Sequence, residues 1–124
     1  MIYDEKEIQK LIDNLDIVQV IGEYVNLKKA GSNYKGLSPF KDEKTPSFTV
    51  SPVKNIFKDF STQIGGNVIS FYMRINDISF VQAVEELSQK YNIPLKKKRE
   101  YRTINQEINR RKAVNKEYFD ILNE

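Results

Sequence analysis

The chain has 124 residues, of which 40% are apolar and 30% charged, so it is long enough for one modest soluble domain with an appendage. It contains no cysteine, which excludes disulfide bonds and agrees with a cytoplasmic location. No apolar run reaches about 18 residues, so no membrane-spanning helix and no membrane partner are expected. The net charge is only +3, but residues 28–58 hold seven lysines and two acidic residues, which favours a nucleic-acid partner.

Two helices are predicted at the start of the chain. Asp4 is positioned to cap the first, in which apolar residues recur at helical spacing from Ile8 to Leu15. Asp16 is positioned to cap a second, shorter helix over residues 17–24. The apolar residues of both helices are expected to belong to the core.

The middle of the chain is rich in residues that interrupt regular structure. Residues 31–67 hold three of the four prolines and four of the five glycines. Between these residues, and just before them, lie short runs in which apolar and polar residues alternate, a pattern typical of β-strands joined by tight turns. The sequence therefore predicts an α+β fold, in which a small antiparallel β-sheet of about four or five strands is flanked by helices. The predicted strands cover residues 25–30, 33–37, 47–51 and 56–60.

Two more helices are predicted after the sheet. The first runs from Asn67 to about Ile75, and the second begins after Ser79, with Gln82 completing a capping box. From residue 96 the composition changes to a basic run that leads into an amphipathic helix. The chain is therefore divided into a domain over residues 1–95 and a basic linker with a C-terminal linker helix over residues 96–124.

The segment YKGLSPFKDEKTPSF, from Tyr34 to Phe48, closely resembles the N-terminal zinc-binding (CHC2-type) domain of bacterial DNA primases. Gly65-Gly66-Asn67, which runs into a predicted helix, resembles the same family. The resemblance covers residues 3–95 approximately and implies a zinc-ribbon-like sheet. It further implies a module that binds single-stranded template DNA and assists the initiation of RNA primer synthesis in DNA replication. The nucleotidyltransferase chemistry of the family, with its Mg²⁺, lies in a separate polymerase domain, toward which the linker would lead.

The zinc ligands of the family are missing from this chain. Where the family has Cys-x-x-His and Cys-x-x-Cys, the chain has Ser38, Lys41, Asp59 and Thr62, and it has no cysteine or histidine elsewhere. The chain is thus expected to be a variant that has lost all four ligands and binds no zinc or other cofactor. One carboxylate makes a Mg²⁺ or Ca²⁺ site a weak alternative.

Another interaction is then needed at the former metal site. We predict an ion pair between Lys41 and Asp59, with the hydroxyls of Ser38 and Thr62 within hydrogen-bonding range. Such a pair contributes only about 0–1 kcal/mol when exposed, so apolar burial has to supply the remaining stability. The side chains expected to be buried there are Phe40, Phe60 and Ile64. The alternative is that all four former ligand positions face solvent.

Single-stranded nucleic acid is held by basic grooves and by aromatic rings on which bases stack. The sheet region offers both, and the family resemblance places four of its lysines, Lys28, Lys29, Lys44 and Lys54, at template-contacting positions. In the alternative interpretation the aromatic residues are core and the lysines merely face water. Strand alternation does not decide whether Phe48 belongs to the core or to the binding surface. The predicted DNA-binding residues are Lys28, Lys29, Asn33, Tyr34, Lys35, Lys44, Thr45, Ser47, Phe48, Lys54, Phe57, Lys58 and Arg74.

No catalytic constellation is visible in the sequence, because there is no histidine, no cysteine nucleophile, no P-loop and no carboxylate cluster for two-metal chemistry. Implied partners are single-stranded template DNA, the primase polymerase domain in the same or a neighbouring molecule, and the replicative helicase for the whole enzyme. The alternative function is a stand-alone protein-interaction or DNA-binding module derived from this domain.

Overall fold

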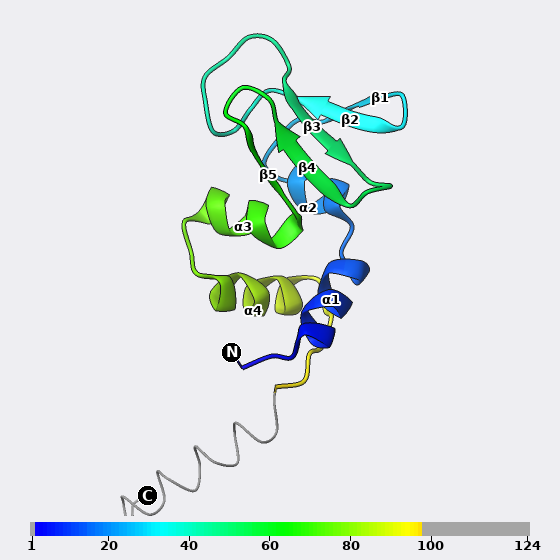
Figure 1. The fold of residues 1–124 in the computed structure, drawn as a ribbon, viewed down its shortest axis with the longest axis vertical. Coiled ribbons are helices and arrows are strands. Elements are labelled where there is room, and N and C mark those ends of the chain that lie inside the picture. The colour runs from blue at the N-terminus through cyan, green and yellow to red at the C-terminus, as the bar shows by residue number, and fades with distance from the viewer. Residues whose placement is uncertain (1, 98–124) are drawn as a thin grey trace, which may run out of the picture. The chain divides into compact units, whose positions relative to one another are not determined.

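The sheet consists of five antiparallel strands that pair in their order along the chain (Figure 1). The structure is a computed structural model in which residues 2–97 are described. Helices α1 and α2 precede the sheet, and α3 and α4 follow it, which confirms the predicted α+β fold. The elements are α1 (Glu5–Asn14), α2 (Ile17–Gly22), β1 (Lys28–Ala30), β2 (Asn33–Gly36), β3 (Phe48–Ser51), β4 (Ile56–Asp59), β5 (Ile64–Gly66), α3 (Val68–Asn76) and α4 (Phe80–Lys90).

The chain divides into two compact units. Residues 8–94 form the larger unit, which contains the whole sheet. In the smaller unit, which joins residues 1–7 to the chain from residue 95 onward, Tyr3 forms an isolated antiparallel bridge with Lys97. The predicted linker helix lies outside the described residues, and within residues 2–97 no helix is long and apolar enough to cross a membrane.

The predicted caps of α2 and α4 form, and a cap that was not predicted lies at the start of α3. The Asp16 carboxylate accepts hydrogen bonds from two backbone amides of α2, and the Asn67 side chain accepts one from the Ser70 amide at 2.9 Å. The Ser79 hydroxyl accepts a hydrogen bond from the Gln82 amide at 3.2 Å, but the Gln82 side chain donates to Glu86 instead of reaching back to Ser79. The capping box at α4 is therefore only half formed, because the Gln82 side chain turns toward the Glu86 carboxylate one turn further on.

Two strand assignments differ from the prediction. The strand predicted from residue 25 starts only at Lys28, because the backbone amide of Val25 still bonds to the carbonyl of Ile21, at 2.9 Å, and continues the helical turn. The position of the fifth strand, β5, was not predicted, since two of its three residues are glycines and carry no alternating pattern. It pairs along β4, with Phe57 opposite Gly66 and Asp59 opposite Ile64.

A cluster of aromatic rings forms the core between the sheet and α3. Phe48 and Phe57 stack on neighbouring strands with their ring centroids 5.6 Å apart. Phe71 of α3 meets both rings edge-on at 5.8 and 5.4 Å, and Phe40 lies 5.9 Å from Phe71 and 6.3 Å from Phe48. Phe48, Phe57 and Phe71 are 0%, 2% and 0% exposed, so this cluster fixes one face of the sheet as the inner face.

Gly36 of β2 packs closely against the segment that precedes β1. A Cβ atom at Gly36 would come within 2.8 Å of Val25 Cγ1 and 2.9 Å of the Asn26 carbonyl oxygen. We therefore expect Gly36→Ala to lower the free energy of unfolding by about 1–3 kcal/mol, measured by urea denaturation. Gly22→Ala is the matched control, because no atom lies within 4 Å of its added Cβ, and it should be neutral or slightly stabilising. Equal effects of the two substitutions would contradict this packing.

Candidate functional site

A row of lysines crosses the sheet on the face opposite to the aromatic core. The register pairs Lys28 with Lys35, Lys35 with Thr49, and Thr49 with Lys58. Residues directly opposite one another in antiparallel strands share a face, and the alternating neighbours Val50 and Phe57 are buried on the inner side. We call Lys28, Lys35, Thr49 and Lys58 the lysine row. Among the described residues no acidic side chain forms an ion pair with its three lysines.

Exposed apolar side chains accompany the lysine row. On β4 and just after it, Ile56, Lys58 and Phe60 alternate with the buried Phe57 and Asp59, so the first three point outward. Ile56 is 41% exposed and Phe60 is 58% exposed. A shallow hollow of about 430 Å³ lies here, and Asn33, Thr49, Ser51, Lys54, Ile56, Lys58 and Phe60 are among its lining residues. We call the lysine row and this hollow together the outer sheet face.

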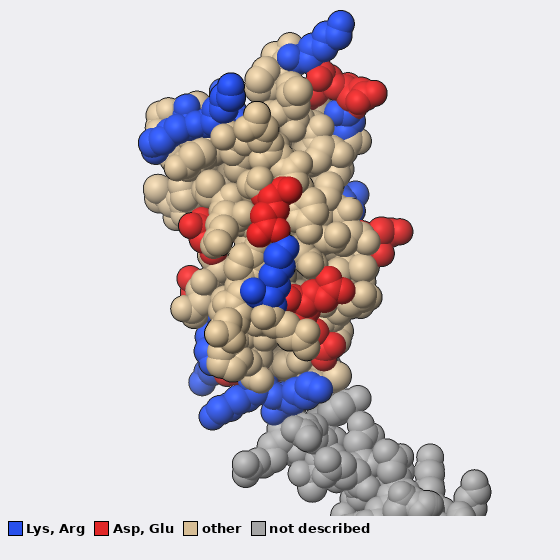
Figure 2. All heavy atoms as spheres, turned by 180° about the vertical axis from the view of Figure 1, so that it is seen from behind, with Lys and Arg blue, Asp and Glu red and all other residues tan. Residues whose placement is uncertain are grey.

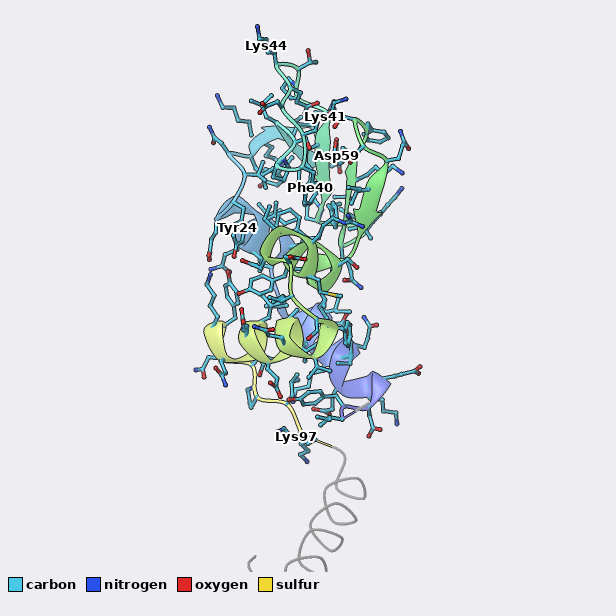
Figure 3. The ribbon with its side chains drawn as sticks, turned by 90° about the vertical axis from the view of Figure 1, so that its left-hand side faces the viewer. Tyr24, Phe40, Lys41, Lys44, Asp59 and Lys97 are labelled. Carbon is cyan, nitrogen blue, oxygen red and sulfur yellow. The ribbon has the colours of Figure 1, made fainter. Side chains whose placement is uncertain are left out.

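A second concave surface lies beside β1 and β2. It has a volume of about 690 Å³, and its apolar lining includes Val25, Leu37, Pro39 and Pro46. Four lysines line it and no acidic residue does, so we call it the cationic groove. Figure 2 shows lysine side chains gathered over the β1–β2 hairpin, and Figure 3 shows Lys44 at the far end of its loop. The four lysines are Lys28, Lys29, Lys35 and Lys44.

Most of the predicted DNA-binding residues lie on these two surfaces. Lys28 and Lys35 belong to both, Lys29 and Lys44 to the groove, and Asn33, Lys54 and Lys58 to the hollow of the outer sheet face. Thr45 is exposed on the loop beside Lys44. Arg74 is not brought together with them, because it lines a separate hollow with Met73 and Asp77 on α3 and the turn after it.

The predicted stacking aromatics require correction. Phe48 and Phe57 are core residues and offer no ring to a nucleobase. Phe60, which was predicted to be buried, is instead the exposed aromatic ring of the outer sheet face. It has the same strand parity as Lys58, a signal that was already present in the sequence, whereas Phe57 has the opposite parity.

Two other predicted contact residues are engaged within the protein. The ring of Tyr34 is half-buried, and the Lys29 ammonium lies 5.3 Å from its centroid in a cation–π contact. The Ser47 hydroxyl donates to the Glu43 carboxylate, at 2.7 and 2.8 Å from its two oxygens. Neither side chain is therefore a freely available contact for a phosphate or a base.

The former ligand positions form a hydrogen-bonded cluster around a buried carboxylate. Asp59 is 0% exposed and accepts hydrogen bonds from the hydroxyls of Ser38, Ser61 (2.7 Å) and Thr62 (3.0 Å), and from the Ser61 amide (3.0 Å). The predicted proximity of the Ser38 and Thr62 hydroxyls is thereby confirmed. The alternative of four solvent-facing positions is wrong for Ser38 and Asp59, which are both buried. We call Ser38, Asp59, Ser61 and Thr62 the hydroxyl cluster.

The predicted ion pair between Lys41 and Asp59 is wrong. Lys41 is exposed, and within the described part of the chain no ion pair joins it to Asp59 (Figure 3). The carboxylate points to the inner side of the sheet, where an ammonium group would have to lose its hydration, while neutral hydroxyls satisfy the same oxygens at a smaller desolvation cost. Of the three side chains expected to be buried, Phe40 and Ile64 are partly buried, Phe40 against Phe48, whereas Phe60 is exposed.

Two carboxylates near the former metal site remain ionised at neutral pH. Burial raises the pKa of Asp59, but the hydrogen bonds from Ser38, Ser61 and Thr62 together outweigh burial and hold this pKa below its usual value. The backbone amide of Ser38 and the hydroxyl of Ser47 lower the pKa of Glu43. Each anion is thus stabilised by hydrogen-bond donors and not by a cation.

The residues of the cluster do not fit a zinc ion. Zinc takes thiolate, imidazole or carboxylate ligands, and in residues 2–97 no three cysteine, histidine, aspartate or glutamate side chains come together. The neutral hydroxyls of Ser38 and Thr62 are poor substitutes, and both point their hydrogens at Asp59. The resemblance to a zinc-binding domain therefore extends to the fold but not to the metal ligands.

The exchanged roles of Phe57 and Phe60 can be tested by stability. Phe57→Ala removes a ring from the aromatic cluster and should lower the free energy of unfolding by about 3–5 kcal/mol. Phe60→Ala removes a largely exposed ring, and we expect a loss below about 1 kcal/mol. Urea denaturation of both variants measures the contrast. A larger loss for Phe60→Ala than for Phe57→Ala would show that the assignment of the two faces is incorrect.

Comparison with known proteins gives the same family as the motif. The family model described as the CHC2 zinc finger matches residues 3–103. The DNA primase of Staphylococcus aureus (strain COL) is 51% identical over 90 residues, which cover 73% of this chain and 15% of that protein. The DNA primase of Clostridium acetobutylicum is 45% identical over 122 residues, covering 98% of this chain and 19% of that protein.

A solved structure is similar as well. The crystal structure of the Aquifex aeolicus primase, containing zinc-binding and RNA polymerase domains, matches with a TM-score of 0.67 and 47% identity over 74% of this chain and 22% of that one. The chain thus spans less than a quarter of the length of these relatives. Because the family model covers most of its residues, the chain belongs to the CHC2 zinc finger family and is homologous to DNA primases.

Proposed function

We propose that this chain is the N-terminal template-recognition module of a DNA primase, which binds single-stranded DNA and assists the initiation of RNA primer synthesis. The observation that carries the proposal is the lysine row beside an exposed aromatic ring. Lys28, Lys35 and Lys58 lie in register on one face without an acidic partner among the described residues, and the exposed ring of Phe60 lines the same hollow as Lys58. This is the combination by which proteins hold single strands irrespective of sequence.

The lysine row has an energetic cost that a bound polyanion removes. Like charges directly opposite one another destabilise a sheet, and Lys28 and Lys35 are paired in this way. Phosphate groups neutralise such a pair and release counterions, which strengthens binding at low salt. The cationic groove continues the positive surface from Lys28 and Lys35 to Lys44, so a strand can follow it from the sheet onto the loop.

The remaining parts of the proposal concern the parent protein. The module itself offers no catalytic constellation, so nucleotidyl transfer belongs to a polymerase domain in the same or a neighbouring molecule. That domain would hold the Mg²⁺ ions, and the replicative helicase would be a partner of the whole enzyme in the cytoplasm. The homology to DNA primases, including one solved with an RNA polymerase domain, supports this placement.

A second candidate function rests on the apolar residues of the same surfaces. Leu37, Val53, Ile56 and Phe60 are 48%, 83%, 41% and 58% exposed, which also suits contact with another protein. In that case the module would be a stand-alone interaction domain. Binding of single-stranded DNA separates the two functions, because only template recognition requires the lysine row to contact a polyanion.

The contribution of the lysine row can be measured by fluorescence anisotropy with a labelled single-stranded oligonucleotide at several salt concentrations. Lys35→Ala should weaken binding several-fold at low salt and reduce the slope of log affinity against log salt by about 0.7. Lys6→Ala on α1 is the control and should change neither quantity. If the two variants lose the same affinity, the row is not the binding surface, and if the folded wild type does not bind at all, the protein-interaction function is favoured.

The contribution of Phe60 should differ from that of the lysines. Phe60→Ala removes a stacking ring and should weaken binding by about 5- to 150-fold without changing the salt slope, because no charge is lost. Phe60→Trp keeps an aromatic ring and should retain the affinity. Phe60→Leu keeps an apolar side chain but no ring. If Phe60→Leu binds as tightly as the wild type, the residue makes a general apolar contact and not a stacking contact.

A further inference from the structure

We propose that the hydroxyl cluster and the Glu43 carboxylate take over the structural role of the zinc ion, so that this domain folds and keeps its binding surfaces without any metal. The inference rests on the disagreement between a zinc-finger family and a chain without cysteine or histidine. It does not depend on the proposed function, because it concerns what holds the loop over residues 37–47 against the turn over residues 59–64.

Asp59 joins these two segments in the way that a central metal ion would. One carboxylate oxygen accepts hydrogen bonds from the hydroxyl and the amide of Ser61, at 2.7 and 3.0 Å. The other accepts from the hydroxyls of Thr62, at 3.0 Å, and of Ser38. Ser38 lies just after β2, whereas Ser61 and Thr62 lie in the turn between β4 and β5. Four contacts from two separate segments thus converge on one side chain.

Glu43 closes the loop in the same manner. Its carboxylate accepts hydrogen bonds from the backbone amides of Ser38, at 2.8 Å, and Ser47, at 3.3 Å, and from the Ser47 hydroxyl. The loop is therefore fastened at both ends to one side chain in its middle. Ser38 takes part in both attachments, since its amide donates to Glu43 and its hydroxyl donates to Asp59. The Ser38 hydroxyl oxygen also accepts a hydrogen bond from the Phe40 amide at 3.1 Å.

The network is complete in the described residues. No buried side-chain nitrogen or oxygen atom in residues 2–97 lacks a hydrogen-bond partner, although Asp59 is 0% and Ser38 only 9% exposed. A metal site that had merely lost its ligands would leave polar atoms unsatisfied at this position, which is costly in a buried place. Both oxygens of Asp59 are instead occupied by donors, and a cation could bind there only by displacing them.

The arrangement also determines where part of the cationic groove lies. Lys44 and Pro46, which line the groove, belong to the loop that Glu43 and Ser38 hold in place. Carboxylates and hydroxyls therefore position a part of the candidate interface.

Metal content and thermal unfolding of the 124-residue chain test the proposal directly. Elemental analysis of protein purified without chelator should find far less than one zinc per chain. The midpoint of thermal unfolding, followed by circular dichroism, should be the same with added EDTA and with added zinc. The zinc-binding domain of the Aquifex aeolicus primase, treated in parallel, is the positive control for the chelator. Stoichiometric zinc in this chain, or a midpoint that falls with EDTA, would overturn the proposal.

Substitutions identify the groups that replace the metal. Asp59→Asn should lower the unfolding midpoint by roughly 5–15 °C, because the amide cannot accept all four hydrogen bonds. Asp42→Asn is the matched control, since Asp42 is exposed in the same loop region, and it should leave the midpoint unchanged. If Asp59→Asn does not fold, Thr62→Val and Ser38→Ala, each removing one donor hydroxyl, should give smaller graded losses. Unchanged midpoints in Asp59→Asn, or in both single-donor variants, would refute the role of the cluster.

Discussion

The alternation of side chains along β4 links the core, the former metal site and the candidate interface. Five consecutive residues, from Ile56 to Phe60, point alternately outward and inward. Phe57 enters the aromatic cluster and Asp59 enters the hydroxyl cluster, while Lys58 and Phe60 face outward with Ile56. A shift of this strand by one residue would exchange the two faces, because the period of a strand is two. The pairing of β4 with β3 and β5 is therefore the constraint on which the other features depend.

A metal and a hydrogen-bonded cluster stabilise a small domain in different ways. A structural zinc supplies on the order of 10–16 kcal/mol of folding free energy at one point, whereas a hydrogen bond to a charged group contributes about 1.5–3 kcal/mol. Several such bonds, spread over Asp59 and Glu43, are needed for a comparable effect, and they act beside an aromatic cluster that α3 completes. Under the proposal, stability in this chain is distributed over the core and the loop instead of residing in one ion.

The proposed interface uses lysines that the fold does not need. Lys28 and Lys35 oppose each other on the outer sheet face, and no acidic residue lines the groove that they share with Lys44. Such an arrangement weakens the isolated sheet and is compensated when a polyanion binds. The apolar lining of the groove and the exposed ring of Phe60 add contacts that suit bases. Positive charge and an exposed aromatic ring thus both lie on the outer sheet face, which is the combination that single-strand binding uses.

The sequence by itself determined the type of each helix, the caps at Asp16 and Ser79, the antiparallel sheet and the concentration of lysines, because these depend on local patterns and composition. It also determined that zinc ligands are missing. Only the tertiary structure decided which aromatic rings are core, since alternation defines two faces but not which of them α3 covers. The same holds for Asp59: Ser61 and Thr62 are its neighbours in the chain, but Ser38 comes from a separate segment, so the choice of Ser38 over Lys41 depends on the path of the loop.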